Sequence, residues 1–542
     1  MKGLMKYMRW LWRNSAGVRG RLAFNVVLGT LNVALNLLFI GLCKHLVDIA
    51  TGDVEGSIPM FAGIIIGVIV LRLLVTAVNV RIENLTTSKM NFIIRRRLYS
   101  SLLQSKWNGR ERLHSGDTLN RLETDVSTVT GVICSDFPQL FSTLIQLVAA
   151  VAYLSTMDIR LAIVLLIITP VFLIVSRLFF RKMRTLTRVI RDTESLVQSH
   201  LQESIQHRVV ISSMENGGQM EDRLDDLQDT EYDQVKARTR FTIFARTVVS
   251  ASFLFGYIAA FLWGVFGIAS GAITFGVMTA FLQLVGQIQR PVVNITRQIP
   301  SFIYSTASID RLMELEDSPK EETGDPVRIE GPVGIRIEDL TFRYPDGENN
   351  VMSGLSHDFA PLSRTAIVGE TGIGKSTLIR LILALLEPNS GSITLYGRSS
   401  SAKASPLTRC NLVYVPQGNT LFSGTIRENL LMGDPEASEE RMKEVLEVAQ
   451  AGFVFSLPAG IDSPCGEGGA GRSEGQAQRI AIARGLLRPG DILLLDEFSS
   501  SLDPETEEKL MESVSRFAEG KTIIFITHRE KVSAWCDSIL RL

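Results

Sequence analysis

Long apolar spans occur only in the first 300 residues of this 542-residue chain, and no other feature constrains its fold as strongly. A helix that crosses a bilayer needs about 20 predominantly apolar residues. Six spans approach or exceed this length, and we predict them at 22–47, 58–80, 137–156, 159–180, 247–268 and 272–290. Any one of them could be a buried helix of a soluble protein, but six in one half favour membrane crossing.

Lys and Arg residues in the connecting segments predict the orientation of these spans. Residues 1–21 carry six of them and no Asp or Glu, and segments 81–136 and 181–246 are also rich in Arg. By the positive-inside rule these three segments, and both termini, face the cytoplasm. We therefore expect a multi-pass protein of the cell inner (cytoplasmic) membrane. Residues 1–20 suit a helix lying along the inner leaflet, with a plain cytoplasmic start as the alternative.

The two inner connections are long, whereas the outer ones are almost absent. Helical hairpins of this length would reach far below the bilayer, since a helix rises 1.5 Å per residue. Their predicted tips, near 113–125 and 206–216, are rich in turn and capping residues. We interpret these tips as mechanical couplers to a cytoplasmic domain, and solvated loops are the alternative.

Several polar residues lie within the first two predicted spans. Ionisable groups at such depth usually face a bundle interior or a wet cavity, so these positions could line a substrate path. The alternative is a structural pair, or a side chain that extends to the headgroups. The residues are Asn25, Asn32, Asn36, Lys44, His45 and Arg72.

Composition excludes several classes of protein. With 56 Lys and Arg against 57 Asp and Glu, the net charge of −1 gives no reason to expect nucleic acid as a partner. A chain with 46% hydrophobic and 21% charged residues can bury a large core, so it is not mainly disordered. The five cysteines form no C-x-x-C pair, which argues against a disulfide framework or a zinc site.

A second domain follows a polar linker rich in Gly and Pro. Apolar strand-like runs at 365–368, 411–415, 492–495 and 522–526 alternate with helical patterns, which predicts an α/β domain with a mainly parallel sheet. Ligands bind such sheets at the carboxyl ends of the strands. The predicted fold is thus a membrane α-helical bundle followed by an α/β nucleotide-binding domain. Its parts are 1–20 (interfacial segment), 21–315 (transmembrane domain), 316–334 (linker) and 335–542 (nucleotide domain).

The first strand-like run of this domain is followed by a P-loop and then by a helical pattern. Glycines let backbone N–H groups curl around phosphate oxygens, and the helix directs its positive end toward them. Lys375 would reach the β and γ phosphates, and Ser376 could ligate Mg²⁺. ATP or GTP binding is therefore expected. The loop comprises Gly369, Glu370, Thr371, Gly372, Ile373, Gly374, Lys375, Ser376 and Thr377.

Two carboxylates end the run at 492–495, and an imidazole follows the run at 522–526. Asp496 is placed to hold the Mg²⁺ shell, and Glu497 to orient or deprotonate an attacking water. His528 is placed where a γ-phosphate would be sensed, although a lone His would more often be structural. These residues predict hydrolysis of the nucleotide and not only its binding.

With these motifs the chain resembles the ATP-binding cassette transporters, and specifically the exporter-type half-transporters. The resemblance covers nearly the whole chain, and it includes 421–429 and a first coupling segment at 115–125. It implies that Tyr344 stacks on adenine, and that Gln417 touches Mg²⁺ and responds to the membrane domain. It also implies that Asp503, in the family segment just after Glu497, is one of the nucleotide-binding residues. It also implies ATP and Mg²⁺ as cofactors.

The signature segment before Asp496 departs from the Leu-Ser-Gly-Gly-Gln pattern of that family. It reads Arg472, Ser473, Glu474, Gly475 and Gln476. In the family this segment clamps the γ-phosphate held by the partner's P-loop, and Ser473, Gly475 and Gln476 could still do so. Glu474 brings a carboxylate toward an anion, which is unfavourable unless it turns away or pairs, for example with Arg472.

This departure bears on the partner, which the resemblance implies is a second half-transporter. We slightly prefer a homodimer over a heterodimer in which this chain donates an altered signature to a degenerate site. The chain also ends fourteen residues after His528, earlier than the family usually does.

The sequence therefore predicts an ATP-driven exporter or flippase for a small amphipathic substrate, such as a drug, lipid or peptide. An importer on the same fold, or an ATP-gated channel or regulatory subunit, is the alternative. A soluble cassette ATPase acting on nucleic acid is disfavoured by the six spans.

Overall fold

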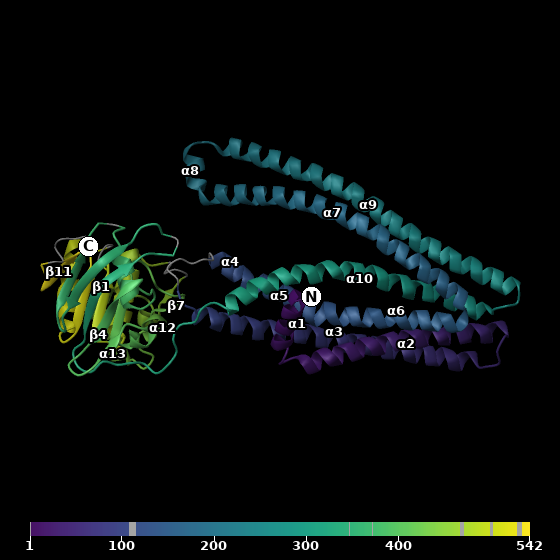
Figure 1. The fold of residues 1–542 in the computed structure, drawn as a ribbon, viewed down its shortest axis with the longest axis horizontal. Coiled ribbons are helices and arrows are strands. Elements are labelled where there is room, and N and C mark those ends of the chain that lie inside the picture. Colours follow the sequence, from purple (N-terminus) through teal and green to yellow (C-terminus); the bar gives the residue numbers. More distant parts are fainter. Residues whose placement is uncertain are drawn as a thin grey trace. The chain divides into compact units, whose positions relative to one another are not determined.

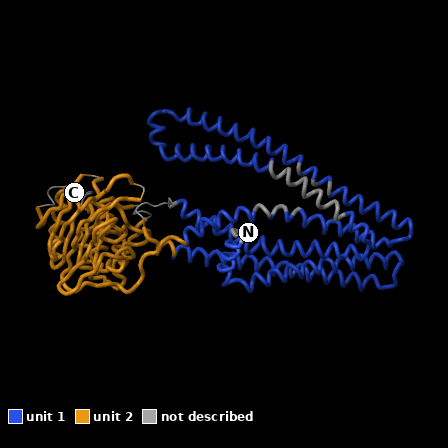
Figure 2. The backbone as a smooth tube through the Cα atoms, in the orientation of Figure 1, with its two compact units in different colours: residues 1–100, 116–316 blue, residues 101–115, 317–542 orange. Residues whose placement is uncertain are grey.

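The computed structural model describes residues 2–107, 115–345, 347–370, 372–466, 471–498, 502–527 and 534–542. The chain forms two compact units, which Figure 2 shows in two colours. Unit 1 comprises residues 1–100 and 116–316, and unit 2 comprises residues 101–115 and 317–542.

Unit 1 is built of helices, several of them far longer than a bilayer is thick (Figure 1). The longest, α9, has 53 residues, which corresponds to about 80 Å of helix. Two short π-helical turns, η1 and η2, interrupt the segment before α6. The elements are α1 (Lys2–Asn14), α2 (Arg19–Thr51), α3 (Ile58–Leu103), α4 (Ser115–Asn120), η1 (Arg121–Asp125), α5 (Val126–Gly131), η2 (Val132–Asp136), α6 (Phe137–Met157), α7 (Ile159–Gln206), α8 (Arg208–Ser213), α9 (Gly217–Ala269) and α10 (Phe275–Glu316).

Four helical segments among the described residues are long and apolar enough to cross a membrane. They are α2, α3, the continuous stretch Gly116–Met157 and α9, and they contain four of the six predicted spans. The other two predicted spans fall on α7 and α10. Between 283 and 290, α10 carries three Gln and one Arg, which makes its span more polar than the others.

Large apolar side chains lie on the outside of unit 1. Leu73 on α3 is 64% exposed and Phe255 on α9 is 72% exposed, and many others on these helices are similar. A soluble protein rarely exposes such extensive apolar surface, whereas lipid chains cover it at no cost. Unit 1 is therefore a helical membrane domain.

The predicted tip at 206–216 coincides with a turn in the structure. The antiparallel helices α7 and α9 pack along each other, and the short helix α8 joins their ends (Figure 1). The other predicted tip, 113–125, is described only from Ser115 onward, where α4 and η1 lie.

The N-terminal segment forms the helix α1, which is attached to the end of α10. The indole N–H of Trp10 donates to Glu316 at 2.9 Å, and Arg13 forms an ion pair with the same carboxylate at 2.8 Å. Trp10 is buried against protein, whereas Trp12 is 66% exposed. Only Trp12 of this pair is available to a membrane interface.

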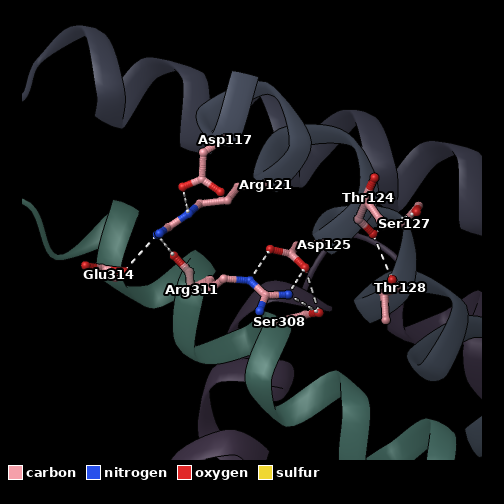
Figure 3. A network of polar contacts seen from close by, with 9 residues as sticks. All are labelled: Asp117, Arg121, Thr124, Asp125, Ser127, Thr128, Ser308, Arg311 and Glu314. Atoms are coloured by element: carbon pink, nitrogen blue, oxygen red, sulfur yellow. Dashed lines mark hydrogen bonds and ion pairs between the residues drawn. The ribbon is translucent and has the colours of Figure 1, made fainter. Parts of the chain in front are cut away.

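A buried polar network joins η1 to α10 within unit 1 (Figure 3). Asp125 is 2% exposed and accepts hydrogen bonds from Arg311, with Nε at 2.7 Å, and from the Ser308 hydroxyl at 2.8 Å. Arg121 donates to Asp117 at 3.1 Å and to Glu314 at 2.8 Å. The predicted first coupling segment is thus held to α10 by charge-assisted hydrogen bonds.

Unit 2 contains a five-stranded, fully parallel sheet with strand order β11-β3-β10-β9-β6. All four predicted strand-like runs belong to it, so the prediction of a parallel α/β sheet is confirmed. Its central strands β9 and β10 are buried at every residue, as strands covered on both faces must be. The strands are β3 (Arg364–Val368), β6 (Leu412–Val415), β9 (Ile492–Asp496), β10 (Thr522–Ile526) and β11 (Ser538–Arg541).

Unit 2 also contains a four-stranded antiparallel sheet in the order β2-β1-β4-β5, which was not predicted from the sequence. Its strands are β1 (Gly334–Phe342), β2 (Met352–Phe359), β4 (Ser390–Tyr396) and β5 (Ser401–Lys403), and a small pair is formed by β7 (Gly424–Thr425) and β8 (Pro464–Cys465). The helices are α11 (Lys375–Ile382), α12 (Ile426–Leu431), α13 (Glu439–Val448), α14 (Glu474–Leu487) and α15 (Pro504–Phe517), with short 3₁₀ turns η3 (Pro406–Asn411), η4 (Gly452–Ser456) and η5 (Gly460–Asp462).

Candidate nucleotide site

The predicted P-loop connects the end of β3 to the start of α11. Gly372 and Gly374 adopt φ values of 91° and 115°, in the region that favours glycine. A Cβ at Gly374 would also lie 2.7 Å from Cγ1 of Val351. The loop curves tightly because these two positions have no side chain. Thr371, another predicted member, lies outside the described residues.

We expect Gly374→Ala to destabilise the protein by about 1–3 kcal/mol, since it adds backbone strain and a close contact. Gly452→Ala is the matched control, because a Cβ there meets nothing within 4 Å and its φ is not positive. Thermal unfolding of the full-length protein, with and without ATP, would measure both variants. Equal unfolding midpoints would contradict the proposed strain.

Lys375 is the first residue of α11, and its side chain lies within the loop. Only 6% of the residue is exposed, and its ammonium donates to the carbonyls of Gly369 at 2.7 Å and Glu370 at 3.0 Å. These bonds hold the charge beside the backbone N–H groups that open the helix. The arrangement is that of an anion site for phosphate.

Because the sheet is parallel, β3, β9 and β10 end at the same edge. The P-loop follows β3, and Asp496 is the last residue of β9, paired with Ile526 of β10. The structure therefore brings the phosphate loop and the predicted acidic pair to one edge. His528 follows β10, but it lies outside the described residues.

Asp496 is 4% exposed and accepts a hydrogen bond from the Tyr414 hydroxyl at 3.3 Å. Burial raises the pKa of Asp496, and the neighbouring Glu497 charge adds to this, while the Tyr414 hydrogen bond and the charges of Arg380 and Lys375 oppose it. A bound divalent cation would favour the charged carboxylate.

The backbone and side chain of Glu497 are both held in place. Its φ is 44°, an uncommon value for a residue with a side chain. Its N–H donates to the Ile526 carbonyl at 3.0 Å, and its carbonyl accepts from the buried Gln478 side chain at 3.1 Å. Gln417 donates from Nε2 to the Glu497 carboxylate at 2.6 Å. Such backbone strain, fixed by tertiary contacts, is typical of functional positions.

The predicted Mg²⁺ ligands supply suitable donors. The Ser376 hydroxyl, the Gln417 carboxamide and the Asp496 carboxylate all offer hard oxygen atoms, and Mg²⁺ commonly takes few protein ligands together with substrate phosphates. Among the described residues, no cluster of three or more His, Cys, Asp or Glu side chains could hold a metal alone. The three predicted ligands therefore fit Mg²⁺ by the chemistry of their oxygen donors.

Tyr344 follows β1 and is fixed to the P-loop helix. Its hydroxyl lies 3.0 Å from Oγ1 of Thr377, and its ring packs edge-on against Phe342 at 5.0 Å between centroids. The half-buried ring is therefore held beside α11.

The signature segment caps α14. Ser473 is the N-cap residue: its hydroxyl accepts from the Gln476 N–H, and the Gln476 side chain accepts from the Ser473 N–H, both at 3.3 Å. Gly475 is buried in the first turn, and Glu474 is exposed. Of the two alternatives for Glu474, turning away or pairing, no pair with Arg472 occurs among the described residues, and Arg472 donates to the Pro464 carbonyl at 3.3 Å. Glu474 lies in the first turn of α14, where the helix dipole favours a carboxylate.

Asp503 is also a capping residue. It accepts from the N–H of Thr506 at 3.0 Å at the start of α15, and this hydrogen bonding lowers its pKa. Two residues at this site were not predicted from the sequence: Tyr414, which contacts Asp496, and Gln478, which contacts Glu497. Tyr414 lies in the predicted run at 411–415 and Gln478 lies two residues after the signature segment, but only the tertiary fold shows that they contact the acidic pair.

These observations define a class of protein: a membrane domain of long helices joined to an α/β domain that carries a phosphate loop and an acidic pair at one sheet edge. Comparison with known families agrees with this class. The ABC transporter transmembrane region matches residues 22–292, half of the chain, and the ABC transporter domain matches residues 352–500. The chain belongs to the ABC transporter family.

Several relatives share most of this organisation. The chain is 26% identical over 459 residues to the "Putative multidrug export ATP-binding/permease protein YgaD" of Bacillus subtilis, covering 84% of this chain and 79% of that protein. It is 27% identical to the "Fatty acid ABC transporter ATP-binding/permease protein" of Mycobacterium bovis, over 85% of this chain and 73% of that protein. It is 30% identical to "ABC transporter B family member 1" of Dictyostelium discoideum, over 80% of this chain and 48% of that protein.

Proposed function

We propose that the protein is one half of a dimeric, ATP-driven exporter or flippase. The observation that carries this proposal is the convergence of Lys375, Asp496 and Glu497 at one sheet edge, in a chain whose other unit is a membrane domain. The relatives named as export proteins, one of them as a multidrug export protein, support an outward direction. Both termini would lie in the cytoplasm of a cell whose inner membrane holds the protein, as the charge of residues 1–21 favours.

In this proposal Lys375 and the P-loop N–H groups bind the phosphates, and Tyr344 supports the adenine. Ser376, Gln417 and Asp496 would hold Mg²⁺, which neutralises phosphate charge during transfer. Glu497 would orient or deprotonate the attacking water, with Gln417 positioning its carboxylate. His528 would sense the γ-phosphate, as predicted from its place after the run at 522–526.

The second copy would complete each site with Ser473, Gly475 and Gln476, and Asp503 would lie nearby. ATP must bind the closed dimer more tightly than the open one, since only differential affinity shifts an equilibrium. Retention of the Ser473–Gln476 cap, which preserves the geometry of the segment, supports the homodimer. A heterodimer remains the second arrangement.

Reconstitution of this chain alone into liposomes tests the proposal. We expect Mg²⁺-dependent ATP hydrolysis that EDTA abolishes and vanadate inhibits, and ATP-driven movement of a labelled phospholipid toward the leaflet opposite the nucleotide domain. Movement toward the nucleotide-domain side would indicate an importer, and downhill ion flux without matching hydrolysis would indicate a channel. Absence of hydrolysis by the chain alone would argue against the homodimer.

A further inference from the structure

A polar cavity of about 470 Å³ lies within unit 1, between α2, α3, α6 and α10. Its volume falls within the range of small-molecule sites, roughly 300–1,000 Å³. Such sites are usually lined by apolar side chains, but amide and hydroxyl groups dominate this one. They include Asn25, Asn36, Asn79, Ser142, Gln146 and Gln287.

Three charged side chains also line the cavity: Arg72 and Glu83 from α3, and Arg290 from α10. Their formal sum is +1. Arg72 donates from Nε to Asn32 at 3.2 Å, and Asn32 in turn donates to the Thr76 hydroxyl at 3.0 Å. In the described part of the chain, these contacts fix the guanidinium without neutralising it with a carboxylate. Positive charge on a fixed fork of donors favours an anion.

The cavity also presents acceptor atoms that need donors. Asn25 is 4% exposed, and its Oδ1 has no hydrogen-bond partner among the described residues. The buried Oδ1 of Asn79 also has no hydrogen-bond partner among them. Buried polar atoms are nearly always paired in folded proteins. A wholly apolar compound would leave both atoms unsatisfied, whereas a hydroxyl or amide donor could pair with them.

We propose that this cavity binds the polar end of the transported compound, and that this end carries a phosphate or carboxylate together with hydroxyl or amide donors. The inference rests on the proposed transport function and narrows its substrate from amphipathic compounds in general to anionic, hydrogen-bonding ones. A lipid headgroup and a water-soluble anion share this chemistry. Arg72 and Arg290 bind the anion, and the amides accept its donors.

Direct binding to the full-length protein tests this proposal without nucleotide. Native mass spectrometry would compare phosphatidylglycerol with phosphatidylcholine of the same acyl chains, and free glycerol 3-phosphate as competitor. We expect at least about a fivefold preference for phosphatidylglycerol, because charge-assisted hydrogen bonds are the stronger ones. Displacement by glycerol 3-phosphate would assign the site to a soluble anion, and its failure to compete would assign it to a lipid headgroup.

Charge-neutral variants connect the preference to the cavity. Arg72→Gln should reduce the preference for phosphatidylglycerol to about twofold or less. Glu83→Gln should increase this preference severalfold, because Glu83 carries the only acidic charge among the lining residues. Arg290→Gln, at an exposed position, gives a second test if Arg72→Gln does not fold. Arg160→Gln is the matched control, because Arg160 is exposed at the start of α7, outside the cavity.

Equal retention of the two lipids without competition by glycerol 3-phosphate would overturn the proposal. So would a preference that is unchanged in both Arg72→Gln and Arg290→Gln. Basal ATP hydrolysis, measured on the same preparation, reports separately on the proposed function. Loss of hydrolysis with intact anion preference would count against the transport cycle and not against the anion site.

Discussion

Glu497→Gln should lower ATP hydrolysis by roughly 10²- to 10⁴-fold while ATP binding is retained. The amide has the volume of the carboxylate and can still accept the hydrogen bond from Gln417 Nε2, so the local structure should persist. It cannot take a proton from water. Turnover of the reconstituted variant and its affinity for a fluorescent ATP analogue would separate the two effects, and the bound nucleotide should stabilise the closed dimer.

A matched substitution checks that the effect belongs to this position. Glu512→Gln removes the same charge from an exposed site on α15, where the residue pairs with Arg516 one turn away, and it should leave turnover unchanged. Ordinary hydrolysis rates in Glu497→Gln would exclude Glu497 as the base. A comparable loss of ATP affinity would instead indicate that the charge serves binding.

The sequence predicted the P-loop and its flanking strand and helix because the necessary information is local. Glycine spacing, a short apolar run and a helical pattern lie within about twenty residues of one another. Four of the five parallel strands were predictable for the same reason, since strands buried on both faces read as unbroken apolar runs. The fifth, β11, is mostly exposed and was not predicted. The strands of the antiparallel sheet are partly exposed and interrupted by bulges, so their pattern was weaker.

Contacts between residues far apart in the chain could not be predicted from the sequence. Arg72 and three Asn residues were noted as unusual within their spans, but the Gln and Arg side chains of α10 that complete the cavity are far away in the chain. The contact of Gln417 with Glu497 likewise joins two loops that only the sheet brings together. Ser473 and Asp503 were predicted from motifs, whereas their roles as helix caps required the backbone.

The network between η1 and α10 gives the second large prediction. Arg311→Met leaves the buried carboxylate of Asp125 without its cationic partner, and breaking a buried pair in this way typically costs 3–5 kcal/mol. Since the Arg311 side chain is 45% exposed, water can replace part of the interaction, and we expect about 3 kcal/mol of destabilisation. Denaturant titration of the full-length protein in mixed micelles would measure the free energy of unfolding.

Two further variants distinguish charge burial from lost packing. Asp125→Asn combined with Arg311→Met should recover about half of the lost stability, because the neutral amide can still accept from Ser308 and no unpaired charge remains. Lys236→Met, which breaks an exposed pair with Asp233 on α9, should change stability by less than about 0.5 kcal/mol. If the double variant were as unstable as Arg311→Met alone, the contribution of Arg311 would lie in packing. The predicted coupling segment would then be held to α10 by shape and not by charge.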